Sequence, residues 1–188
     1  HNRVEGILSY TSLLFIPSTA PFDLFQPDRS SAIKLYVNKV FITDKCEGLI
    51  PSYLRFLRGV VDSEDLSLNI SREMLQNDPK LAKIQSRLVK RVFSELKKKA
   101  EKTPEDYEVF WEAFGAVLKE GVYEDFANRE TILELCRFRS TNGEGLSDLG
   151  SYVGRMKDGQ DAIYYITGQD FEQVSASPQL EGFRAKGI

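Results

Sequence analysis

The sequence is short of the residues on which most catalytic and metal sites depend. Its single histidine is His1, so a Ser-His-Asp or Cys-His arrangement has almost nothing to draw on. The two cysteines, Cys46 and Cys136, are far apart and fit no metal-ligand or redox spacing. Neither common type of glycine-rich phosphate loop is present. We therefore expect a chain that holds no metal and completes no reaction alone.

The sequence also lacks a strong net charge and a long apolar run. Its formal net charge is −3, so no global field attracts nucleic acid or anionic lipid. No apolar run approaches the roughly 20 residues that a membrane helix needs. With 41% hydrophobic residues, two cysteines and no signal peptide, the chain is predicted to be globular and cytoplasmic. It opens without an initiator methionine, which predicts a segment of a longer protein.

Apolar patterning predicts strands and one short helix near the start of the chain. Ile7–Ile16 is rich in β-branched and aromatic residues, as strands are. Ala32–Ile42 alternates and then ends in three apolar residues, which predicts a bulge or a strand buried on both faces. Pro51 predicts the first turn of a short helix over Ile50–Leu57. A short strand is expected at Val60–Val61.

Longer helices are predicted next. Asp78–Lys102 has an apolar stripe at steps of three and four residues, opposite a basic face. A basic face with so few aromatic residues is typical of a solvated helix, with an acidic partner protein as the alternative and nucleic acid disfavoured. Thr103 and Pro104 predict the N-cap and first position of a helix that ends at about Lys119. A shorter helix is expected over Asn128–Phe138.

The flexible stretch Ser140–Gly145 is the best candidate for an internal boundary. Beyond it, the pattern predicts a helix over Leu146–Met156, a strand over Ala162–Thr167 and a helix from about Gln169. One strand and two helices cannot complete a sheet, so this part is expected to be a truncated α/β unit.

The predicted fold class is α/β (α+β). A larger part, which includes the candidate catalytic loop described next, is expected over residues 1–102, and a helical connector is expected over 103–140. The truncated smaller α/β unit is expected over 141–188.

The stretch Val60–Gln76, VVDSEDLSLNISREMLQ, is the most informative in the chain. It runs from a strand through a series of acids to one arginine, Arg72, at an expected helix start. A guanidinium on a loop can stabilise the charge that builds on a transferring γ-phosphate, so Arg72 is a candidate arginine finger. The structural alternative is that Arg72 pairs with Asp62, Glu64 or Asp65.

Other candidate site residues are amides and aromatics. Asn69 and Gln76 lie on either side of the candidate arginine, and their amides can bond a phosphate, a partner's backbone or simply a helix end. Trp111 and Phe110 would form a client-binding patch if exposed, but their helical spacing favours the core. For Phe41, at a strand end, packing is the default interpretation.

Four stretches carry a family resemblance: LLFIPSTAPFDLF (Leu13–Phe25), KLYVNKVFITD (Lys34–Asp44), LRGVVDSEDLSLNISREMLQ (Leu57–Gln76) and IYYITG (Ile163–Gly168). They are similar to the middle domain of the heat-shock protein 90 chaperone family, and the resemblance covers essentially the whole chain. RFRST at Arg137–Thr141 and STAPFDLF resemble the family's bacterial form.

The resemblance implies an architecture of larger α/β/α part, helical connector and smaller α/β/α part, within an ATP-dependent chaperone. It implies an N-terminal domain that binds ATP and Mg²⁺, and a C-terminal dimerisation domain. Arg72 would reach the ATP site of the N-terminal domain, Gln76 and Asn69 would take part in the same contact, and Phe41 would belong to an apolar docking patch.

Partly folded client proteins are the implied partners, and the full-length protein is implied to be a homodimer. We expect this segment alone to be a monomer. A non-catalytic docking and client-binding scaffold is the alternative function. Two positions depart from the family pattern: Ser67 stands where proline is usual, and Asn38 where a basic residue is common.

Overall fold

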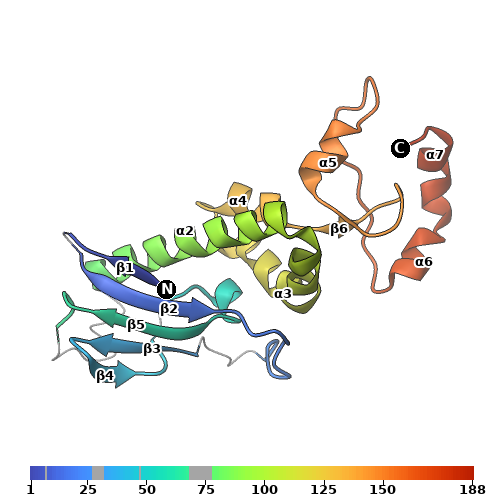
Figure 1. Cartoon of the computed structure of the whole chain (residues 1–188). Helices are drawn as coiled ribbons and strands as arrows, with labels where there is room; N and C mark the ends of the chain where they lie inside the picture. The colour runs from blue at the N-terminus through green and yellow to red at the C-terminus, as the bar shows by residue number, and fades with distance from the viewer. Residues whose placement is uncertain (7, 27–31, 47, 68–77) are drawn as a thin grey trace. The chain divides into compact units, whose positions relative to one another are not determined.

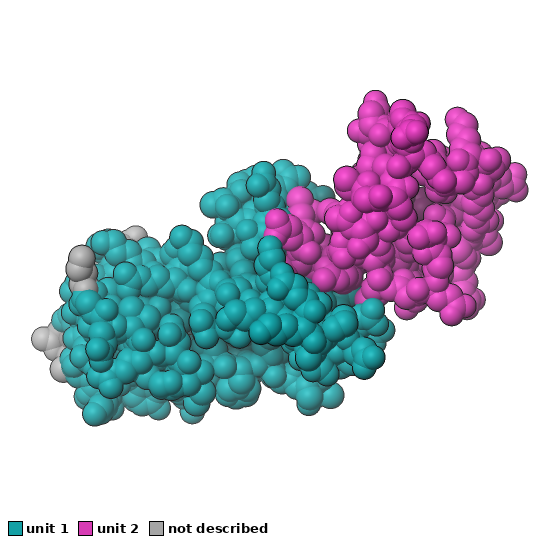
Figure 2. All heavy atoms as spheres, turned by 45° about the horizontal axis from the view of Figure 1, so that its top comes forward, with its two compact units in different colours: residues 1–132 teal, residues 133–188 magenta. Residues whose placement is uncertain are grey.

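The computed structural model of the protein confirms the predicted mixed α/β class. The chain forms two compact units, unit 1 (residues 1–132) and unit 2 (residues 133–188), coloured separately in Figure 2. The structure describes residues 1–6, 8–26, 32–46, 48–67 and 78–188.

Unit 1 is built on a five-stranded mixed sheet (Figure 1). The central strand β5 runs antiparallel to β2 and parallel to β3. In β3, Ile33, Leu35 and Val37 are fully buried while the residues between them are not, which is the pattern of a half-buried strand. The spatial order is β1 (Asn2–Val4), β2 (Tyr10–Phe15), β5 (Arg58–Ser63), β3 (Ala32–Val37) and β4 (Val40–Thr43).

The single strand predicted over Ala32–Ile42 is wrong, because this stretch forms a hairpin of β3 and β4. The chain turns at Asn38 and Lys39, whose φ angles are 49° and 66°. Two consecutive residues in the left-handed region match the twist of paired strands, and asparagine enters that region more readily than most residues. The apolar run that broke the alternation is therefore the start of a second strand.

The helix predicted over Ile50–Leu57 is also wrong, since only a 3₁₀ turn, η1 (Ser52–Leu54), forms there. Strand β5 then begins at Arg58 and is longer than predicted. Gly59 lies inside this strand with a φ of 143°, and a Cβ there would lie 1.9 Å from the carbonyl oxygen of Leu13. Glycine is required because the neighbouring strand approaches so closely.

The long helix α2 (Pro79–Lys102) is confirmed, and Asp78 caps it by accepting a hydrogen bond from the Lys80 amide. Helix α3 (Pro104–Glu124) extends beyond the predicted end and packs beside α2 (Figure 1). Helix α4 (Arg129–Leu135) is shorter than predicted. The predicted stripe of α2 is buried, at Leu81, Ile84, Leu88, Val92 and Leu96.

Aromatic rings from the residues after η1 and from α3 form a cluster in the core. Phe56 lies 5.1 Å from Phe114 and 5.6 Å from Phe110, measured between ring centroids. Beside them, the guanidinium of Arg55 donates to the carboxylate of Glu120, and its Nε donates to the carbonyl of Leu24. This polar bridge joins η1 to α3 and to the loop before β3.

Unit 2 consists of short elements. The strand predicted over Ala162–Thr167 is wrong, because no strand ladder includes these residues. The predicted helix over Leu146–Met156 is split into a two-residue strand and a short helix. The elements are β6 (Phe138–Arg139), β7 (Leu146–Ser147), α5 (Leu149–Gly154), α6 (Phe171–Ser175), η2 (Pro178–Leu180) and α7 (Glu181–Ala185).

Candidate functional site

The predicted catalytic residue and its two supporting amides lie outside the described residues. Arg72, Asn69 and Gln76 all fall within positions 68–77. The residues on both flanks of these ten positions are described: the N-terminal flank follows β5, and the C-terminal flank is the start of α2. The geometry of the candidate site is therefore the geometry of these flanks.

The N-terminal flank is held by hydrogen bonds to Asp65. Its carboxylate accepts a hydrogen bond from the backbone amide of Ser9, at 2.5 Å. Its own amide donates to the hydroxyl of Ser63, at 3.3 Å. The register of β2 against β5 places Ser9 beside this turn, and the Glu64 amide donates to the Ser9 carbonyl at 3.1 Å. The flank is thus an extension of the sheet.

Two carboxylates of the acidic run have backbone partners in the structure. Asp62 accepts a hydrogen bond from the amide of Lys39 in the β3–β4 turn, at 3.1 Å. Asp65 accepts from Ser9, as described above. These two carboxylates therefore have backbone partners within the sheet, where they stabilise a turn and a strand end. Sequence reasoning missed both bonds because each joins residues more than 20 positions apart.

Phe41 lies on β4 and is 52% exposed. Its ring packs edge-on against Tyr36 on β3, with the centroids 5.6 Å apart. Val40 beside it is also half exposed. An aromatic residue with about half of its surface exposed can dock against a partner.

Trp111 and Phe110 do not meet the condition for a client-binding patch, because both are buried in α3, with 7% and 5% of their surface exposed. Phe110 contacts the rings of Phe56 and Phe114. The Trp111 ring packs so closely on Gly115 that a Cβ there would lie 2.5 Å from it. The 3.6-residue period turns both side chains towards the core, so the expectation of a surface at these two residues is corrected.

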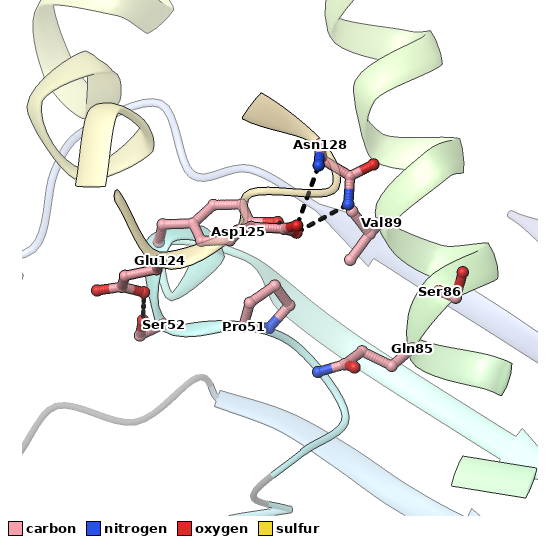
Figure 3. A pocket seen from close by; sticks show the side chains of 9 residues that line it. Pro51, Ser52, Gln85, Ser86, Val89, Glu124, Asp125 and Asn128 are labelled. Carbon is pink, nitrogen blue, oxygen red and sulfur yellow. Dashed lines mark hydrogen bonds between the residues drawn. The ribbon is translucent and has the colours of Figure 1, made fainter. Parts of the chain in front are cut away.

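A polar hollow of about 330 Å³ lies where η1, α2 and the α3–α4 turn meet (Figure 3). Tyr53 donates its hydroxyl to the carboxylate of Asp125 at 2.7 Å, and Asn128 donates its backbone and side-chain N–H groups to the same carboxylate. Burial, followed by this hydrogen bond, raises the pKa of Tyr53 far above its usual range. Ser52 donates to Glu124.

Asp125 is the centre of this arrangement. Burial acts to raise its pKa, but the hydrogen bonds from Tyr53 and Asn128 outweigh burial and lower the pKa. The carboxylate therefore stays ionised and joins η1 to the start of α4. We interpret the hollow as a structural junction.

The basic face of α2 is partly neutralised by ion pairs. Glu95 pairs with Arg91 and Lys98, each at 3.0 Å, and Lys99 pairs with Asp106 at 3.2 Å. These exposed pairs are typical of a solvated helix face. Within the part of the chain that the structure describes, no group of three or more His, Cys, Asp and Glu could hold a metal ion. No described helix is long and apolar enough to cross a membrane.

Comparison with known proteins gives a consistent result. The family model described as "Hsp90 protein" matches residues 1–188. The chain is 64% identical to the chaperone protein HtpG of Paramagnetospirillum magneticum over 188 residues and 54% identical to that of Orientia tsutsugamushi over 188 residues. Each match covers 100% of this chain and 30% of the relative. The chain thus spans less than a third of the length of these curated relatives.

The structural comparison agrees. The middle domain of a heat shock protein of Plasmodium falciparum is similar to this chain, with a TM-score of 0.87 and 38% sequence identity. The match covers all of this chain and 73% of that domain structure. The likeness extends to both compact units, because the alignment leaves no part of the chain out.

Proposed function

The chain belongs to the Hsp90 family and has the fold of its middle domain, and from that premise we propose that it completes an ATPase site. It is the middle segment of an ATP-dependent molecular chaperone. An N-terminal domain binds ATP and Mg²⁺, and this segment supplies Arg72 to the γ-phosphate. Because the chain covers 30% of its relatives, turnover is a property of the larger protein.

The observation that supports this role is the position of the arginine between two ordered flanks. In the sequence, residues 68–77 lie between β5, the central strand of the sheet, and α2. A side chain carried between such elements can be presented from outside to a partner's pocket. A guanidinium is permanently charged and forked, so it can bond two oxygens of a phosphoryl group as charge develops there.

Other residues have supporting roles in the proposal. Gln76 and Asn69 donate or accept amide hydrogen bonds at the same contact, and they orient the segment against the nucleotide domain. Phe41 docks that domain through its exposed ring. Client proteins bind the segment in part through exposed apolar side chains, such as Leu13 and Phe15 on β2.

The proposed setting is the cytoplasm of a bacterial cell. The full-length protein is a homodimer joined through a C-terminal domain, and this segment alone is a monomer. In this proposal, residues 1–102 contain the catalytic segment, residues 103–140 form a helical connector between the two parts, and residues 141–188 are the truncated smaller α/β unit. Neither nucleic acid nor a membrane is a partner.

The half-exposed apolar residues on β2 and β4 favour a second candidate, a non-catalytic scaffold that docks domains and clients. In this case Arg72 makes a positioning contact and no transition-state contact. The two functions differ in one measurable respect. A catalytic arginine changes turnover without changing affinity for the nucleotide domain, whereas a positioning contact changes affinity.

The test compares Arg72→Ala and Arg72→Lys with wild type in the full-length protein. The alanine variant should lose about a thousandfold in ATP turnover, the scale at which arginine fingers act. Lysine should restore only part, because it keeps the charge and loses the fork. The melting temperature should not change, and the affinity for the nucleotide domain, measured with this chain and that domain as separate proteins, should be the same for wild type and Arg72→Ala. Loss of affinity with proportionate loss of turnover would support the scaffold instead.

A further inference from the structure

The two flanks of residues 68–77 contact each other directly. The ammonium group of Lys80, in the first turn of α2, donates a hydrogen bond to the carbonyl oxygen of Asp65, at 2.6 Å. The bond joins residues 15 positions apart, one on each side of positions 68–77 in the sequence. A cation bonded to a carbonyl is stronger than a neutral pair, although this one is exposed to solvent.

The residue that receives this bond is itself anchored. The carboxylate of Asp65 accepts a hydrogen bond from the backbone amide of Ser9, which lies just before β2. Asp65 therefore accepts one hydrogen bond from the residues before β2 and one from α2. Behind these polar contacts, Leu66 and Leu81 are buried, with 4% and 2% exposed. Each flank thus has an apolar anchor in the core and a polar contact at the surface.

Helix α2 is tied to the same place a second time. Arg87, two turns further along α2, directs its guanidinium at the Leu8 carbonyl at 3.5 Å. The Asp78 cap orders the first turn, from which Lys80 extends. The start of α2, the end of β5 and the approach to β2 therefore form one frame.

We propose that Asp65 and Lys80 are positioning residues that fix the spacing of the two flanks and so act on ATP turnover through Arg72. This inference rests on the proposed function of Arg72. A segment with fixed ends explores fewer arrangements than one with free ends, because loop-closure entropy is already spent. A shift of about 1 Å in a catalytic group can reduce the rate by up to about a hundredfold, so spacing of the flanks matters.

The first test measures ATP turnover by the full-length protein with Lys80→Met, Lys80→Arg and Lys83→Met. Lys83 is exposed on the same helix about one turn away, so it controls for lost surface charge. Lys80→Met should lower kcat about three- to tenfold at unchanged KM for ATP, a fraction of the full misplacement cost. Lys80→Arg should restore it, and Lys83→Met should leave it unchanged.

The second test separates positioning from general stability. Lys80→Met is combined with Arg72→Ala, and it should have no further effect on kcat, because the residue through which it acts is gone. Asp65→Ala should behave like Lys80→Met, while Asp65→Asn, whose amide oxygen can still accept from Ser9, should keep most of the activity. Melting temperatures of the Lys80 variants should match wild type.

The outcomes distinguish the two proposals. If Arg72→Ala lowers turnover and Lys80→Met does not, the frame is structural only and this inference is overturned. If Lys80→Met lowers kcat equally in wild type and in Arg72→Ala, Lys80 acts by another route and the inference also fails. If Arg72→Ala leaves turnover intact, the proposed function fails first.

Discussion

Two stretches with similar sequences form different secondary structure in the two units. AIKLYV at Ala32–Val37 forms strand β3, between β5 and β4, and its alternate residues are fully buried. AIYYIT at Ala162–Thr167 forms no strand, and every residue in it is exposed. The comparison teaches that apolar, β-branched residues produce a strand only where another strand supplies hydrogen bonds and a neighbouring layer covers one face.

The same contrast holds for the units as wholes. Unit 1 contains the buried stripes of α2 and α3 and the inner face of the sheet. In unit 2 the buried residues are Leu135 and Cys136 at its start, and none of residues 137–188, all of which the structure describes, is buried. The free energy of folding is therefore concentrated in unit 1, because burial of apolar surface is its main source.

The largest effect on this contrast between the two units is expected from Phe114→Ala in the core of unit 1. Phe114 is 1% exposed and contacts two other rings, so its loss should lower the free energy of unfolding by about 3–5 kcal/mol. Urea unfolding followed by the fluorescence of Trp111, the only tryptophan, reports on unit 1. Val109 lies on the same helix and is 62% exposed, so Val109→Ala should change the free energy of unfolding by less than about 0.5 kcal/mol. Equal effects would contradict the account.

A smaller effect is expected from Asp125→Asn, and it should depend on pH. The pKa of Asp125 is lowered in the folded protein, so its carboxylate stabilises unit 1 above its unfolded pKa of about 3.9. That contribution is lost as the pH falls through the folded pKa. The free energy of unfolding of wild type should therefore fall as the pH drops from about 5 through the folded pKa of Asp125, and that of the variant should be lower at neutral pH and should fall by less.

Asp148→Asn in unit 2 is the matched control for that experiment. The Ser151 amide lowers the pKa of Asp148 as the main cause, so the sign of its pH dependence is the same. Because Asp148 lies in unit 2, the Trp111 signal should not respond to it. A response of Trp111 fluorescence to Asp148→Asn equal to that for Asp125→Asn would mean that the two units unfold as one.

The smallest effect is expected from Tyr165→Ala in unit 2. Tyr165 is 87% exposed, so its removal should change the free energy of unfolding by less than about 0.5 kcal/mol. Backbone amides of residues 163–166 should also exchange with solvent at least about a hundredfold faster than those of residues 60–62 in β5. Protection of residues 163–166 comparable to that of β5 would show a strand partner that this account lacks.

Features that depend on local period or capping could be predicted from the sequence. The apolar stripe of α2 and its burial follow from spacing alone, whereas the role of Asp78 as the N-cap is seen only in the structure. The hairpin at Asn38–Lys39 was missed because its turn contains no glycine, although both residues adopt positive φ. The strand predicted at AIYYIT is wrong because an apolar sequence pattern does not show whether a neighbouring strand is available to pair with it.

The residues of the candidate site also differ in how far the sequence predicts them. Arg72, Asn69 and Gln76 are predicted from a sequence motif and from the family resemblance that the motif carries. The frame at Asp65 and Lys80 was missed, because the bond between Ser9 and Asp65 depends on the register of β2 against β5. The local signal was the acidic run: its carboxylates are alternative partners of Arg72 by sequence, and in the structure Asp62 and Asp65 accept hydrogen bonds from backbone amides.

The most direct test of the central claim is ATP turnover by the isolated nucleotide domain of the matching chaperone, measured alone and with this chain added. The account predicts that wild-type chain stimulates turnover and that Arg72→Ala binds the domain equally well without stimulating it. A covalently joined pair of the two parts should be run alongside, so that weak association cannot hide the effect. Equal turnover with wild type and Arg72→Ala, with binding demonstrated for both, would contradict the assignment of Arg72 as a catalytic residue.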